Sequence, residues 1–140
     1  MKADMLFEKA LRQQSEGDFD GAKSGYRRIL QREPRHALAL CNLAVILERE
    51  GEVAASDALF QRALAAGGSN PDILLSRIVT LMGRDRNAEA LAVVEKLLAA
   101  HPRHFFGLLN KCVVLGRLKR FAEAEAVARA SARGWIRLGG

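Results

Sequence analysis

Bulky rings and helix breakers are scarce in this chain of 140 residues, which has eight aromatic residues, three prolines and two cysteines. Val, Ile and Thr together contribute 14 residues, whereas Ala contributes 23 and Leu 20, and this balance favours helices over strands. Because few large rings are available to fill space, a core of Ala and Leu requires helices that approach one another closely. The composition therefore predicts an all-α fold.

Long apolar runs are absent as well. No stretch approaches the ~18 apolar residues of a membrane span, and the charged residues near the start rule out a secretory signal, so we expect no membrane association. Cys41 and Cys112 lie in apolar helical patterns far apart in the sequence, which is typical of free thiols in a reducing compartment. We therefore expect a cytoplasmic protein.

Acidic residues are scarce only in the second half of the chain. The net charge is +6; residues 1–70 carry ten basic and ten acidic groups, while residues 71–140 carry twelve basic and six acidic groups. A solvated basic surface is the plain interpretation. An acidic partner and nucleic acid are the alternatives.

A repeat organises the whole chain. The tripeptide Pro-Arg-His occurs at 34–36 and again at 102–104, an offset of 68, and sliding the chain by half that distance keeps its pattern in phase. Four 34-residue units result, which occupy residues 3–36, 37–70, 71–104 and 105–138.

Each unit carries apolar or small residues at helical spacing in two segments separated by turn residues such as Gly17-Asp18 and Gly51-Glu52. Small residues dominate two columns that would meet between the segments. The eighth column contains Ala10, Ala44, Ile78 and Cys112, and the twentieth contains Ala22, Ser56, Ala90 and Ala124. Each unit therefore reads as a pair of close helices.

The spacing resembles the tetratricopeptide repeat (TPR), with a small residue at position twenty, an aromatic at twenty-four (Tyr26, Phe60) and Pro at thirty-two (Pro34, Pro102). The resemblance implies a right-handed α-α superhelix, or solenoid, of four helical hairpins forming a single domain over residues 1–140. It also implies a noncatalytic module for protein binding, which we expect to be bacterial.

Catalytic and metal-binding patterns are missing. No serine lies in a Gly-x-Ser-x-Gly setting, and there is no phosphate loop or dinucleotide fingerprint. His36, His101 and His104 lie at turns without the converging ligands that zinc requires, so we assign them structural or solvent-exposed roles. We expect no enzyme activity, no metal and no cofactor.

The resemblance places a concave groove on the first helix of each unit. Its fifth and ninth columns are apolar in all four units, and such a stripe, if exposed, marks a partner surface. The candidate groove residues are Phe7, Leu11, Leu38, Cys41, Asn42, Val45, Arg49, Leu75, Val79, Met82, Phe106, Leu109, Asn110, Val113 and Arg117. We expect a protein or peptide partner with an apolar segment that could be acidic.

Several alternatives stay open at this point. The two columns would be core if the helices were rotated, an interpretation that basic residues at the seventh position (Lys9, Arg77, Lys111) support. A clamp for a carboxylate terminus is excluded, because it needs polar groups where the apolar columns lie. The chain could also associate with itself, belong to a larger enzyme or a secretion-chaperone-type protein, or, less readily, bind nucleic acid.

Overall fold

The computed structural model describes residues 2–137, with side chains as far as residue 134. Within that range the chain is helical throughout, and it contains no strand. The helices are α1 (Ala3–Ser15), α2 (Phe19–Arg32), α3 (Ala37–Arg49), α4 (Val53–Gly67), α5 (Pro71–Gly83), α6 (Asn87–Ala100), α7 (Phe105–Arg117) and α8 (Phe121–Arg137). The predicted all-α class of paired helices is thus confirmed.

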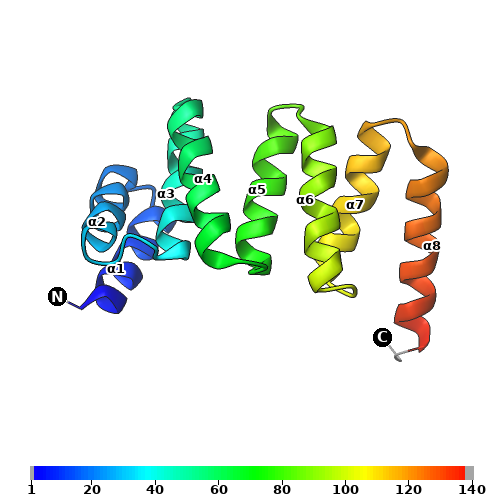
Figure 1. The fold of residues 1–140 in the computed structure, drawn as a ribbon, viewed down its shortest axis with the longest axis horizontal. Helices are drawn as coiled ribbons and strands as arrows, with labels where there is room; N and C mark the ends of the chain where they lie inside the picture. Colours follow the sequence, from blue (N-terminus) through cyan, green and yellow to red (C-terminus); the bar gives the residue numbers. More distant parts are fainter. Residues whose placement is uncertain (1, 138–140) are drawn as a thin grey trace. The chain divides into compact units, whose positions relative to one another are not determined.

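The chain forms two compact units, each with four helices. Unit 1 is Met1–Gly68, in which α1 packs on α2, α2 on α3 and α3 on α4. Unit 2 is Ser69–Gly140, in which the helices α5 to α8 pack consecutively and α5 also contacts α7. Each unit therefore contains two antiparallel hairpins, which Figure 1 shows in sequence colours. That all four hairpins act as one domain remains a prediction.

The turn inside every hairpin uses the same backbone conformation. The fifteenth residue of each 34-residue unit has a positive φ: 84° at Gly17, 82° at Gly51, 59° at Asp85 and 61° at Lys119. This left-handed region costs little for glycine but strains a residue with a Cβ. The repeat therefore keeps the turn even where it has lost the glycine.

Side-chain caps hold the starts of α3, α5 and α7. The Nδ1 atoms of His36 and His104 each accept a hydrogen bond of 3.1 Å, from the amides of Ala39 and Gly107. The Asn70 side chain accepts from Asp72 N at 2.9 Å, with Pro71 in the first turn, as the sequence indicates. Two of the three histidines are therefore helix caps.

Close contact within each hairpin depends on the small columns. Ala10, Ala22, Ala44 and Ala90 are fully buried, and a Cβ added to Gly25 would lie 3.0 Å from the Cβ of Ala10. Ser56, which departs from the alanine of its column, donates a 2.8 Å hydrogen bond to the Ala44 carbonyl. The Ser56 hydroxyl thus has a hydrogen-bond partner, and the separation of the two helices is one that an alanine at this position would also allow.

Enlarging a small column residue should destabilise unit 2. We expect Ala90→Leu to lower the free energy of unfolding by about 1–3 kcal/mol, because the added atoms have no space between α5 and α6. Chemical denaturation followed by circular dichroism measures this. Ala92→Leu, on the exposed side of α6, is the control; an unchanged stability of Ala90→Leu would contradict the helix register.

Relieving the strained turn should have the opposite effect. We expect Lys119→Gly to stabilise unit 2 by about 0.5–1 kcal/mol, because glycine adopts a positive φ without a Cβ clash. The same denaturation experiment reports the change. Gly51→Lys, at the equivalent turn of unit 1, is the reciprocal variant, and equal stability of both variants with the wild type would argue against the assigned turn conformation.

Candidate functional site

In unit 2 the groove candidates form an exposed apolar strip on α5 and α7. Val79, Phe106, Leu109 and Val113 are 59%, 56%, 48% and 40% exposed, respectively. Leu75 and Met82 are half-buried beside them. Since α5 contacts α7, these side chains lie on neighbouring helices of one unit. We call the set Leu75, Val79, Met82, Phe106, Leu109 and Val113 the apolar strip.

In unit 1 the corresponding residues are less exposed. Leu11 is 40% exposed, while Phe7, Leu38 and Val45 are half-buried. Cys41 is buried, with 2% of its surface exposed, and therefore offers almost no surface to a partner. The Phe7 ring packs against His36 and Tyr26, with centroids 5.2 and 6.0 Å away. The ninth column is thus more open than the fifth.

The polar groove candidates mainly join helices to one another. Asn42 Nδ2 donates to the Tyr26 hydroxyl at 3.4 Å, and Asn110 Nδ2 donates to a carbonyl of its own helix. The Arg49 guanidinium lies 4.6 Å from the centroid of the Phe19 ring, and Arg117 donates a 3.0 Å hydrogen bond to the Met82 carbonyl. These arrangements leave the face mostly apolar with cations at its margins.

Tyr26 is the centre of a polar chain through unit 1. Its hydroxyl donates to Gln14 Oε1 at 2.6 Å and accepts from Asn42, so it joins α1, α2 and α3. Burial raises the pKa of the Tyr26 hydroxyl, because the phenolate would lose its hydration. The neutral form is therefore favoured in the folded protein.

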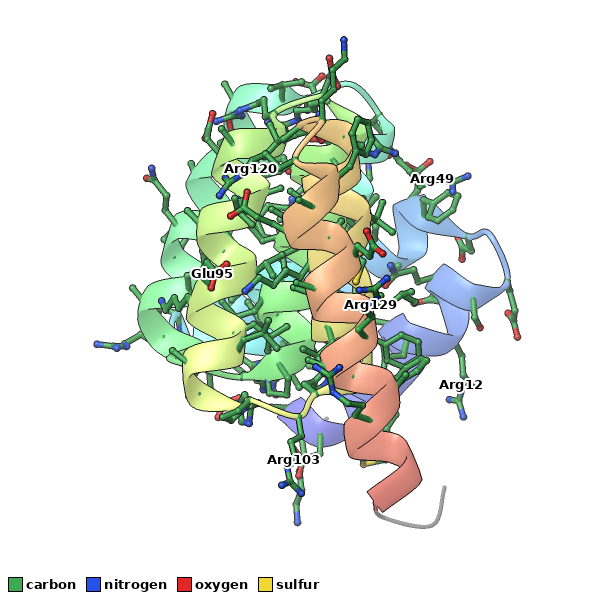
Figure 2. The ribbon with its side chains drawn as sticks, turned by 90° about the vertical axis from the view of Figure 1, so that its right-hand side faces the viewer. Arg12, Arg49, Glu95, Arg103, Arg120 and Arg129 are labelled. Carbon is green, nitrogen blue, oxygen red and sulfur yellow. The ribbon has the colours of Figure 1, made fainter. Side chains whose placement is uncertain are left out.

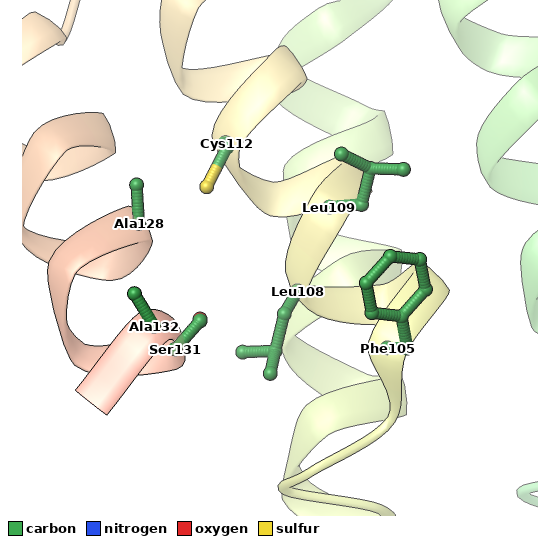
Figure 3. A pocket seen from close by; sticks show the side chains of 7 residues that line it. All are labelled: Phe105, Leu108, Leu109, Cys112, Ala128, Ser131 and Ala132. Carbon is green, nitrogen blue, oxygen red and sulfur yellow. The ribbon is translucent and has the colours of Figure 1, made fainter. Parts of the chain in front are cut away.

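A cavity that the sequence pattern did not predict lies between α7 and α8. Its volume is about 360 Å³, and Figure 3 shows the helix faces that form it. The cavity is lined by Phe105, Leu108, Leu109, Cys112, Ala128, Ser131 and Ala132. Leu109 also belongs to the apolar strip, so cavity and strip are continuous. The available sequence signal is the run of alanines on α8.

A second opening lies between the same two helices. It has a volume of about 400 Å³, and Leu108 and Ser131 line both openings. Arg103 and Lys111 are part of its lining. The contact between α7 and α8 is therefore flanked by space on two sides.

Cations surround this part of unit 2. Residues 96–122 contain no Asp or Glu, and the two carboxylates of α8, Glu123 and Glu125, are paired with Arg120 and Arg129. The hydrogen bonds from Arg120 hold the pKa of Glu123 below its usual range. Figure 2 shows Arg103, Arg120 and Arg129 around α7 and α8, with Glu95 on α6. Lys111 is in turn paired with Glu95 at 3.1 Å, and basic residues outnumber acidic ones around the cavity.

The side chains do not converge on a metal. Among the described residues no group of three His, Cys, Asp or Glu side chains could hold a metal ion. Nor does any described helix have the length and apolar content to cross a membrane. The two cysteines are free thiols.

Helical hairpins repeating every 34 residues, with small residues at the helix crossing and a conserved turn conformation, define a helical-repeat protein. A family model described as Tetratricopeptide repeat matches residues 7–71 and 75–136. The chain therefore belongs to the TPR family.

Related proteins are found in different settings. WspC of Pseudomonas putida, a probable biofilm formation methyltransferase, is 43% identical over 53 residues, which are 38% of this chain and 12% of that protein. The structure of PilF of Pseudomonas aeruginosa is 25% identical, with a TM-score of 0.83 over 94% of this chain and 60% of its own. The chain thus spans only part of the length of both.

A second similar structure contains a peptide. The first TPR of Spaghetti (RPAP3), bound to the HSP90 peptide SRMEEVD, has a TM-score of 0.75 at 21% identity, and the match covers 84% of this chain and 96% of that one. At this identity the similarity shows the fold alone.

Breaking the polar chain at Tyr26 should reduce stability at neutral pH. We expect Tyr26→Phe to cost about 0.5–1.5 kcal/mol, because Gln14 and Asn42 lose their shared partner. Since the folded pKa is raised, the wild type should lose the tyrosine contribution as pH rises above about 10. Urea titrations at pH 8 and at alkaline pH would show a smaller gap between the two proteins at alkaline pH; a constant gap would contradict this assignment.

Proposed function

We propose that the protein is a noncatalytic interaction module whose apolar strip binds an apolar, acidic segment of a partner protein. The observation that carries the proposal is the exposure of Val79, Leu109 and Val113 on neighbouring helices. Large exposed apolar groups on adjacent elements typically mark interaction sites, because their contact with water is unfavourable.

The charge around the strip supports an acidic partner. The second half of the chain has twice as many basic as acidic residues, and Arg117 lies beside Met82 at one end of the strip. Complementary charge increases the association rate and selects against basic partners.

The setting of the module could be a larger protein. The chain matches 12% of WspC and 60% of PilF, so a recognition segment attached to an enzyme or to a larger assembly is the second candidate. In that case the apolar strip would bind a segment of the partner and so bring the partner to a catalytic domain of the larger protein. The two free thiols favour a reducing compartment and thus the cytoplasm.

A charge placed in the strip should prevent partner binding. We expect Val79→Asp to reduce capture of the partner from a bacterial lysate at least tenfold, because a carboxylate would be buried against apolar groups. Affinity capture with mass spectrometry identifies the partner, and circular dichroism checks that helicity is retained. Ala92→Asp, exposed on α6, is the matched control.

Two outcomes would contradict the proposal. If Val79→Asp unfolds unit 2, the column is core rather than surface. If it captures the same proteins as Ala92→Asp, the strip is not the binding site. Binding that weakens steeply between 50 and 200 mM salt and is lost after nuclease treatment would instead indicate nucleic acid.

A further inference from the structure

The cavity between α7 and α8 arises where the last hairpin departs from the repeat. At position twenty-four, Tyr26, Phe60 and Val94 are fully buried, whereas the fourth unit has Ala128. At position twenty-eight the first three units have Leu30, Leu64 and Leu98, whereas the fourth has Ala132. Two columns are therefore truncated together: the twenty-fourth, which is fully buried in the first three units, and the twenty-eighth, which is half-buried there and whose Leu98 lies close to Gly107 of the next hairpin.

Among the side chains that the structure describes, which end at residue 134, the truncation leaves apolar surface uncovered. Phe105 is 52% exposed, Leu108 is half-buried, and Figure 3 shows Ala128, Ser131 and Ala132 on the α8 side of the cavity. A dry cavity of ~150 Å³ in another protein admits benzene. The volume of about 360 Å³ here is accordingly large enough for an aromatic side chain.

The surroundings of the cavity select the charge of its occupant. Arg129 and Arg133 directly follow the two truncating alanines on α8, and Arg103 and Lys111 line the opening on the other side. No carboxylate other than Glu123 and Glu125 occurs in residues 96–137, and both are paired with arginines. Arg129 and Lys111 are themselves paired with Glu125 and Glu95, so Arg133 and Arg103 are the cations that acidic residues beside an inserted ring would meet on the two sides of α8.

A second copy of this chain fits these features poorly. Residues 1–70 are electrically balanced, and residues 71–140 carry the whole excess of six positive charges, so two copies do not attract one another overall. The acidic stretch at Glu16, Asp18 and Asp20 does flank an aromatic residue, but the Phe19 ring already packs against the core of unit 1 and lies beside Arg49. A partner of a different sequence matches the charge better.

We propose that the cavity between α7 and α8 is an anchor site for one aromatic side chain presented by an acidic segment of a partner protein. The partner's ring would occupy the space beside Ala128 that is equivalent to the space filled by the chain's own Tyr26 and Phe60 in the first two units. Because Leu109 borders both regions, this inference rests on the proposed function and adds the feature by which the strip recognises its partner. The aromatic ring supplies affinity, and the flanking carboxylates supply specificity.

Binding of three peptides with blocked ends to the full chain tests which kind of segment the cavity accepts. The probe is acetyl-Glu-Glu-Trp-Glu-Glu-amide, and its matched controls replace Trp by Ala or all four Glu by Lys. We expect the probe to shift the backbone NMR signals of α7 and α8, and each control to bind at least fivefold more weakly. Equal binding of the Ala peptide would overturn the aromatic anchor, and equal binding of the Lys peptide would overturn the acidic partner.

Refilling the cavity with the residues of the other units tests the site. We expect Ala132→Leu and Ala128→Phe to raise the melting temperature by a few degrees and to weaken probe binding at least tenfold. Ala126→Leu, on α8 but outside both linings, should change neither. Unchanged probe binding by both refilled variants, or signal shifts confined to other helices, would overturn the proposal.

The same variants separate this inference from the proposed function. If Val79→Asp abolishes partner capture while Ala132→Leu and Ala128→Phe capture normally, the strip is a binding site and the anchor proposal fails. If none of the three variants affects capture, both fail. Sedimentation velocity tests the remaining alternative, in which a second copy of this chain occupies the cavity. A wild-type dimer that Ala132→Leu dissociates would overturn the proposal in favour of self-association.

Discussion

The close approach of two helices through small residues is the constraint on which the rest of the structure depends. Ala10 and Ala22, and Ala44 and Ser56, let the backbones of a hairpin come near enough for the Ser56 hydroxyl to reach a carbonyl of the facing helix. At such a separation each hairpin has room for one large residue at position twenty-four, such as Tyr26 or Phe60. The alanine-rich composition is therefore a consequence of the helix spacing.

This constraint also explains why the last hairpin differs. When position twenty-four becomes Ala128, the neighbouring side chains of α7 do not collapse into the vacated volume, and a cavity remains. Unfilled apolar volume is unfavourable because its lining loses dispersion contacts. A partner that supplies the missing ring would recover those contacts. Stability and recognition are thus linked at the same two columns, since filling them from within removes the space for a partner.

Much of the fold could be predicted because the same residue pattern occurs four times, so each expected helix and turn is supported by four examples. The odd-numbered helices begin at Ala3, Ala37, Pro71 and Phe105, which are the first residues of the four sequence units. The cap at Asn70 and the turns at Gly17 and Gly51 follow from local chemistry. The histidine caps were not specifically predicted, because an imidazole cap depends on the ring orientation relative to the helix.

The period, the helix pairs, the small columns and the excess of positive charge in the second half are determined by the sequence alone, since each depends on residue types at fixed spacing. Only the tertiary structure decided which apolar residues face water. Cys41 and Val45 are neighbours on one predicted face, yet one is buried and the other half-exposed, because a small rotation of a helix moves a side chain across that boundary. The cavity beside Ala128 and Ala132 has the same origin: whether small residues leave a void depends on how far the facing helix closes in.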